Sequence, residues 1–172
     1  MLYLIDANVL MTAHNSYYAI DAVPEFWTWI AHHGSAGRIK IPREIFDEVK
    51  DGGTDKESDM LYEWIQDANN KACVLLKEKV DADLVRTVIE EGYASDLNDV
   101  EVEKIGRDPF LIAYALASPA DRIVVTTEVS QPKKQRANRK IPDVCKQFGV
   151  DCIDTFQLSK ALKFSTNWKD GS

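Results

Sequence analysis

Short apolar runs alternate with longer helical patterns along this 172-residue chain, and that alternation limits the possible folds more than any other feature. Strands are predicted over residues 2–5, 38–41, 73–76, 122–125 and 151–153. The consecutive Ile123, Val124 and Val125 are typical of a strand buried on both faces. Strands that alternate with helices form a parallel sheet covered on both sides. We therefore expect an α/β fold with three layers, α/β/α, around a central parallel sheet.

Helical spacing of apolar residues fills the intervals between these strands. The helix that starts at Ala7 is expected to break near His14, Asn15 and Ser16, and residues 96–106 are ambiguous. The other helices are predicted over residues 23–33, 42–49, 55–68, 81–93, 108–117, 141–148 and 155–163. Because the chain shows no repeat and no Pro- or Gly-rich linker, we expect a single domain over residues 1–172.

Composition excludes several classes of protein. No apolar run is long enough to cross a membrane, and the N-terminus lacks the basic start of a secretory signal. The three cysteines, Cys73, Cys145 and Cys152, are widely spaced and form no CxxC pair, which indicates reduced thiols rather than a zinc site or a disulfide framework. These observations favour a cytoplasmic protein without a membrane partner.

Four acidic residues occupy positions that a parallel sheet would bring together. Asp6 ends the first strand, Asp108 begins a helix, Glu128 follows the strand over 122–125, and Glu48 lies in the helix after the second strand. Ligands of open α/β sheets bind beyond the carboxyl ends of the strands. Each acid also has an ordinary interpretation: Asp6 and Asp108 as helix N-caps, Glu48 as a surface residue and Glu128 as a loop residue.

Carboxylates that lie close together repel one another unless a cation compensates their charge. Hard oxygen ligands suit Mg²⁺ or Mn²⁺, which can polarise a phosphoryl oxygen, activate water and stabilise a leaving oxygen. Phosphodiester hydrolysis is the natural reaction for such a site. The chain contains no GxxxxGK[ST], GxGxxG or HExxH motif, and its three histidines, His14, His32 and His33, have no evident catalytic partners.

A run of basic residues begins five positions after Glu128. It has no acid between Gln131 and Pro142, although the whole chain carries a net charge of −7, which argues against broad non-specific nucleic-acid binding. The run is either a solvated loop or a strip that steers phosphates to the acidic site. As candidate RNA-binding residues we take Lys133, Lys134, Arg136, Arg139 and Lys140.

At these positions the chain resembles the PIN-domain ribonucleases, including the VapC-like toxin nucleases. Residues 4–10 read LIDANVL, residues 42–49 read PREIFDEV before Gly52, residues 107–113 read RDPFLIA, and residues 124–128 read VVTTE. The segment KIPDVC at residues 140–145 resembles a PIN-like prokaryotic subgroup. The motifs are short, but their order and spacing along nearly the whole chain make the resemblance fairly specific.

The resemblance implies a metal-dependent endoribonuclease, often the toxin of a toxin–antitoxin pair and often a homodimer. It assigns the catalytic and metal-binding roles to Asp6, Glu48, Asp108 and Glu128, with Mg²⁺ or Mn²⁺ as the cofactor. Glu128 stands where the family usually has Asp or Asn, and its longer side chain would shift the metal or bring in a water. Asn8 and Thr126 are expected to support the ligands.

Alternatives remain open for the residues and for the function. Glu44 competes with Glu48, but the offset of Glu48 to Gly52 fits the family pattern and Glu44 is very near the helix start. A PIN-like module that binds RNA or a partner without cleaving is one alternative function. A phosphatase of the haloacid dehalogenase type is another, although that class has a second Asp where this chain has Asn8.

Overall fold

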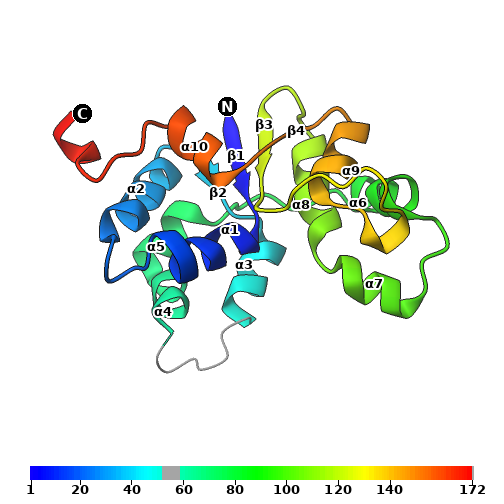
Figure 1. Ribbon diagram of the computed structural model, residues 1–172, viewed down its shortest axis with the longest axis horizontal. Coiled ribbons are helices and arrows are strands. Elements are labelled where there is room, and N and C mark those ends of the chain that lie inside the picture. The colour runs from blue at the N-terminus through cyan, green and yellow to red at the C-terminus, as the bar shows by residue number, and fades with distance from the viewer. Residues whose placement is uncertain (52–58, 172) are drawn as a thin grey trace.

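The computed structural model describes residues 1–51 and 59–171 and has a central sheet with the strand order β2-β1-β3-β4 (Figure 1). The strands are β1 (Leu2–Ile5), β2 (Ile39–Lys40), β3 (Arg122–Val125) and β4 (Asp151–Ile153). Every pair of neighbouring strands is parallel, which confirms the predicted sheet. Because Ile5 pairs with Val125, the residues that follow β1 and β3, Asp6 and Thr126, emerge side by side at one edge.

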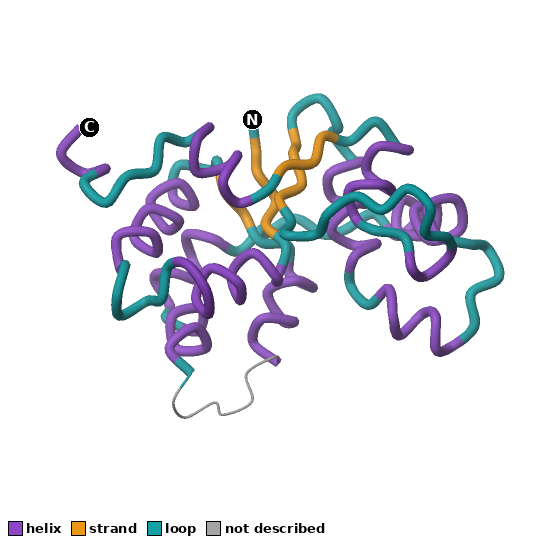
Figure 2. The backbone as a smooth tube through the Cα atoms, in the orientation of Figure 1, coloured by secondary structure: helices purple, strands orange, loops and turns teal. Residues whose placement is uncertain are grey.

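Helices cover both sides of this sheet, which gives three α/β/α layers (Figures 1 and 2). One side carries α1 (Ala7–Thr12), the π-helical turn η1 (Ala13–Tyr17), α2 (Pro24–Ser35), α3 (Arg43–Asp51), α4 (Met60–Gln66), α5 (Ala68–Val74) and α10 (Thr155–Ala161). The other carries α6 (Ala82–Thr87), the π-helical turn η2 (Val88–Tyr93), α7 (Asp99–Ile105), α8 (Asp108–Leu116) and α9 (Ile141–Gln147). Two 3₁₀ turns complete the described chain, η3 (Arg136–Asn138) and η4 (Trp168–Gly171).

The central strands are fully buried and fix the position of the sheet edge. Leu4, Ile5, Val124 and Val125 have no exposed surface, and α8 packs against β3 through an almost wholly buried set of residues. Burying one such aliphatic side chain stabilises a fold by about 1.5–3 kcal/mol. The backbone that carries Asp6 and Thr126 is therefore anchored from both faces of the sheet.

The strand predicted over residues 73–76 is wrong. The main chain remains helical through Val74 at the end of α5, and only an isolated bridge joins Leu75 to Ile41. The cause is Asp67, whose carboxylate accepts hydrogen bonds from the main-chain N–H groups of Asn69 and Asn70. This N-cap starts a new helix and draws the following apolar residues into it.

Most predicted helices differ from the structure by one or two residues at their ends, and two of them differ by more. The helix from Ala7 does not break near His14, because the N–H of Tyr18 donates to the Ala13 carbonyl at 2.7 Å and widens the last turn into η1. The helix predicted over residues 55–68 is described only from Met60 and ends at Gln66. Its first residues, and the Gly52 that follows the second acidic motif, lie outside the described residues. The ambiguous segment 96–106 contains α7, which a capping box between Asn98 and Glu101 starts.

The sequence predicts reduced cysteines and contains no apolar run long enough to cross a membrane. None of the helices among the described residues is long and apolar enough to span a bilayer. Cys73, Cys145 and Cys152 are all free thiols.

Candidate functional site

Asp6 is a buried carboxylate at the carboxyl end of β1, and only 2% of the residue is exposed. It precedes α1 but makes no full capping hydrogen bond. Its one strong partner is the Thr126 hydroxyl, which donates to Oδ2 at 2.8 Å. Burial raises the pKa of Asp6 to about 6, the Thr126 bond lowers it, and the charges of Glu48 and Glu128 raise it further. A hydrogen bond with the main chain of the exposed Asn8 also lowers the pKa of Asp6, but it offsets only part of the rise.

Asp108 is the first residue of α8 and faces the same region. The N-cap of α8 is Arg107, so the carboxylate of Asp108 is not used to cap its own helix. Burial raises the pKa of Asp108 to about 8, and the charges of Asp6, Glu128 and Glu48 add to the rise. Without a bound cation, this carboxyl group is therefore mostly protonated at neutral pH.

Glu48, on α3, is the third acid of the group, and burial raises its pKa while Arg107 lowers it. The Arg107 guanidinium donates to the Glu44 carbonyl at 2.5 Å, which ties α3 to the start of α8. The Glu44 carboxyl group instead interacts with Tyr114 near the far end of α8 and has one buried oxygen without a hydrogen bond. Of the two candidates, the structure places Glu48 nearer to Asp6 and Asp108.

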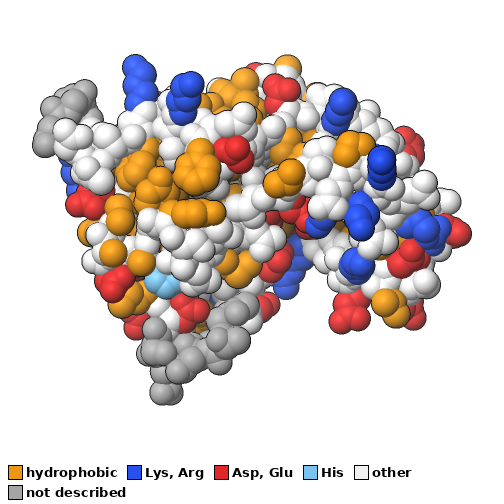
Figure 3. Space-filling view, in the orientation of Figure 1, with side chains coloured by type: hydrophobic (Ala, Val, Ile, Leu, Met, Phe, Trp, Pro, Cys, Tyr) orange, Lys and Arg blue, Asp and Glu red, His pale blue; other side chains and the backbone are white. Residues whose placement is uncertain are grey.

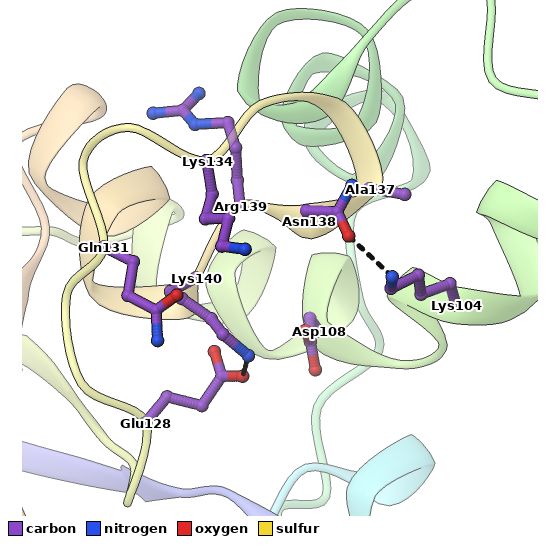
Figure 4. Close-up of a pocket in the computed structure, with 9 residues that line it drawn as sticks. All are labelled: Lys104, Asp108, Glu128, Gln131, Lys134, Ala137, Asn138, Arg139 and Lys140. Atoms are coloured by element: carbon purple, nitrogen blue, oxygen red, sulfur yellow. Dashed lines mark hydrogen bonds and ion pairs between the residues drawn. The ribbon is translucent and has the colours of Figure 1, made fainter.

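Glu128 differs from the other acids because both of its carboxylate oxygens are already bound. Lys140 Nζ lies 2.5 Å from Oε1, and the main-chain N–H of Ile141 donates to Oε2 at 2.8 Å. The N–H of Glu128 donates in turn to the Thr126 hydroxyl at 3.2 Å, so Thr126 links Glu128 to Asp6. In the close-up, the Lys140 amine lies between Glu128 and Asp108 (Figure 4).

Some side chains of the basic run after Glu128 are bonded to other parts of the chain, and others are not. Arg136 contacts Glu101 at 2.7 Å and Asp96 at 2.6 Å, and Arg139 donates to the Gln147 side chain at 2.6 Å. Lys133 and Lys134 are exposed and make no ion pair with any residue that the structure describes. Lys and Arg side chains gather on the side of the molecule that carries α6 to α9 (Figure 3).

Two residues near the site were not predicted from the sequence. The Tyr93 hydroxyl is buried without a hydrogen-bond partner among the described residues, and burial, with the charge of Asp108, raises its pKa above the usual range. Tyr93 ends an amphipathic pattern, so its sequence position indicates only core packing. Arg107 had a clearer signal, because a cation directly before the Asp108-Pro109 pair is placed to meet the neighbouring acids.

The chemistry of the donors fits a hard divalent cation. Asp6, Glu48 and Asp108 offer carboxylate oxygens whose pKa values are all raised, so their charge is incompletely compensated. As placed, no three acidic, Cys or His side chains among residues 1–51 and 59–171 converge closely enough to hold a metal ion. Side-chain rotations would therefore have to bring the three acids onto a cation.

Comparison with known proteins adds a family without a known activity. A family model described as a domain of unknown function (DUF4411) matches residues 3–166. No curated protein and no solved structure matches the chain.

Proposed function

Because the chain belongs to the DUF4411 family, whose function is unknown, we propose an activity from the site itself: metal-dependent hydrolysis of RNA phosphodiester bonds. The observation that carries this proposal is the group of acids at the carboxyl edge of the parallel sheet. The pKa values of Asp6 and Asp108 are raised to about 6 and about 8, with burial as the main cause and neighbouring acids as a further one. A fold retains buried, mutually repelling carboxylates at a ligand-binding edge when a cation or a reaction needs them.

Asp6, Glu48 and Asp108 are the residues that would hold Mg²⁺ or Mn²⁺. A bound divalent cation would supply positive charge for a phosphoryl oxygen and for the attacking water. The chain itself orients the acids: Thr126 fixes Asp6 Oδ2, and Arg107 ties the helix of Glu48 to that of Asp108. Asp108, whose pKa is raised to about 8, would have to give up its proton to hold the cation.

RNA as the substrate is supported by the resemblance to PIN-domain ribonucleases and by two lysines without ion pairs among the described residues, of which Lys134 lines a pocket together with Asp108 and Glu128. Lys133 and Lys134 leave their charge available for phosphates, which dominate the affinity of proteins for nucleic acids. A toxin role, an antitoxin partner, a homodimer and a cytoplasmic location stay predictions from the sequence.

The test compares wild type with Asp6→Asn on an end-labelled single-stranded RNA in Mg²⁺, Mn²⁺ or EDTA. Wild type is expected to cut only with metal, and the variant to lose about 100-fold or more of the rate. The exposed Asp21, before α2, gives a matched control, and Asp21→Asn is expected to cleave like wild type.

Two outcomes would contradict the proposal. Equal cleavage by wild type and Asp6→Asn would show that the activity comes from a contaminating nuclease or from another site. Metal-dependent hydrolysis of p-nitrophenyl phosphate without RNA cleavage would favour a phosphatase instead.

A further inference from the structure

Lys140 and Glu128 form an ion pair inside the acidic site. The side chains are 33% and 20% exposed, so the pair is shielded from solvent more than most surface ion pairs. A metal that bound Glu128 would have to compete at its oxygens with Lys140 or with the N–H of Ile141. The chain has thus already satisfied this one acid, while Asp6 and Asp108 have no cationic hydrogen-bond partner among the described residues.

The lysine has hydrogen-bonding capacity left over. An ammonium group has three donors, and the structure uses one of them, towards Glu128 Oε1. Its charge also acts on Asp108, whose pKa it lowers against the larger effects of burial and neighbouring acids. Lys140 is therefore fixed on one side and open to a ligand on the other.

A pocket of about 250 Å³ lies where Lys140 is open (Figure 4). Four cationic side chains line it, against the two acids Asp108 and Glu128. The cationic residues are Lys104, Lys134, Arg139 and Lys140, of which Arg139 turns its guanidinium away from the pocket, towards Gly92 and Gln147 (Figure 4). Lys104 bonds to the neutral side chain of Asn138 at 2.6 Å, so no acid offsets it there. In a chain with a net charge of −7, a pocket in which cations outnumber acids favours a small anion.

We propose that this pocket binds a phosphate of the nucleic-acid substrate through Lys140, next to the metal held by Asp6, Glu48 and Asp108. Glu128 is then a positioning residue that aims Lys140, and it does not bind the metal. The inference rests on the proposed function and adds to it a subsite and a division of labour among the four acids. The cation of the subsite is built into the chain, so the subsite binds phosphate in the absence of metal.

The first experiment separates Glu128 from the metal ligands. Mn²⁺ binding is measured by calorimetry on wild type, Glu128→Gln and Asp108→Asn. We expect Asp108→Asn to lose about tenfold or more of the affinity and Glu128→Gln to keep it within about threefold. If Glu128→Gln loses as much as Asp108→Asn, Glu128 is a ligand and the inference fails while the proposed function stands. If wild type neither binds Mn²⁺ nor cleaves RNA, the proposed function itself fails.

The second experiment tests Lys140 without metal. Binding of a short fluorescent single-stranded RNA is followed by anisotropy in EDTA. We expect Lys140→Met to weaken binding about tenfold and Lys140→Arg to retain most of it, since a charged hydrogen bond to phosphate is lost only in the first. Lys146→Met is the matched control, because Lys146 is exposed on α9, the helix that Lys140 precedes, and does not line this pocket. Unchanged binding by Lys140→Met would overturn the subsite.

A double-mutant cycle tests whether Glu128 acts through Lys140. In RNA binding and in kcat and KM, Glu128→Gln is expected to add no further loss once Lys140 is Met. Additive losses would show that Glu128 works by another route. The double variant is also expected to fold well, because it leaves neither charge of the pair without its partner. The Gln side chain in this variant keeps an acceptor for the N–H of Ile141.

Discussion

The fold shifts the pKa values of its acids in opposite directions in two regions. One region lies beside β1 and α8, and the other meets the loop between β3 and α9. Burial raises the pKa of Asp6 and Asp108 to about 6 and about 8, whereas hydrogen bonds from Arg136 lower the pKa of Glu101 to about 2. On the loop side, Asp96 and Glu101 pair with Arg136, and Glu128 pairs with Lys140, so the charges of these acids help to hold the structure together. On the sheet side, the negative charges of Asp6 and Asp108 have no paired cation among the described residues. Such charges destabilise the fold and are useful only for binding a ligand.

Among the variants that test this contrast, Asp108→Asn is expected to have the largest effect. The pKa of Asp108 rises on folding from its ordinary 3.8 to about 8, so the folded state binds the proton more tightly than the unfolded state. The stability that this proton provides is complete below pH 4 and is lost as the pH rises towards 8. In EDTA at pH 8 the variant should therefore melt about 2–4 °C higher than wild type, with little difference at pH 4 to 5.

The same variant should lose metal-dependent cleavage and the rise in Tm that excess Mn²⁺ gives to wild type. Thermal melts over a pH series, with and without Mn²⁺, provide the measurement. A lower Tm for Asp108→Asn at every pH would mean that the carboxylate supports α8, and the contrast between the two regions would be broken.

A smaller effect is expected from Lys133 and Lys134 changed together to Ala. RNA binding should weaken and the slope of log affinity against log salt should flatten by about 1.4, since each phosphate contact with single strands accounts for about 0.7. Lys77 and Lys79 give a control with the same change in charge. They flank Glu78, which pairs with Arg122 at the amino end of β3, away from the acids. An unchanged salt slope would indicate that the two lysines bind an acidic partner rather than RNA.

The smallest effect is expected from Arg136→Ala. Arg136 has a positive φ of 52° and ties the loop to α7 through Glu101 and Asp96. Its loss should lower Tm slightly and leave the salt slope of RNA binding close to that of wild type. The pKa of Glu101 is lowered in the folded state, so the difference in Tm should shrink as the pH falls from 4.5 towards 2. A large loss of RNA affinity without a change in Tm would place Arg136 among the RNA contacts instead.

Local pattern was enough to predict much of this molecule. Apolar runs identified all the strands of the sheet, and their parallel arrangement brings Asp6 and Thr126 to one edge because each directly follows a buried strand. The strand predicted at 73–76 failed because the cap at Asp67 lies outside the apolar run that suggested it.

Pairings between distant residues could not be predicted. The basic run looked uniform, yet the partners of Arg136 lie 35 and 40 residues earlier and that of Lys140 lies 12 residues earlier. Nothing in the run itself distinguishes these residues from Lys133 and Lys134. The difference between Glu128 and the other acids has the same origin, since it depends on which side chains the folded loop brings alongside.

The strand order also sets when the site can exist during synthesis. Asp6 is translated before its hydrogen-bond donor, Thr126, which lies 120 residues later in the sequence. β1 can pair with β2 early, whereas its other neighbour, β3, is translated late. Until β3 is translated, the carboxylate of Asp6 has no hydrogen bond from Thr126, and such long-range pairing slows folding. The acidic site is completed only when synthesis has passed β3.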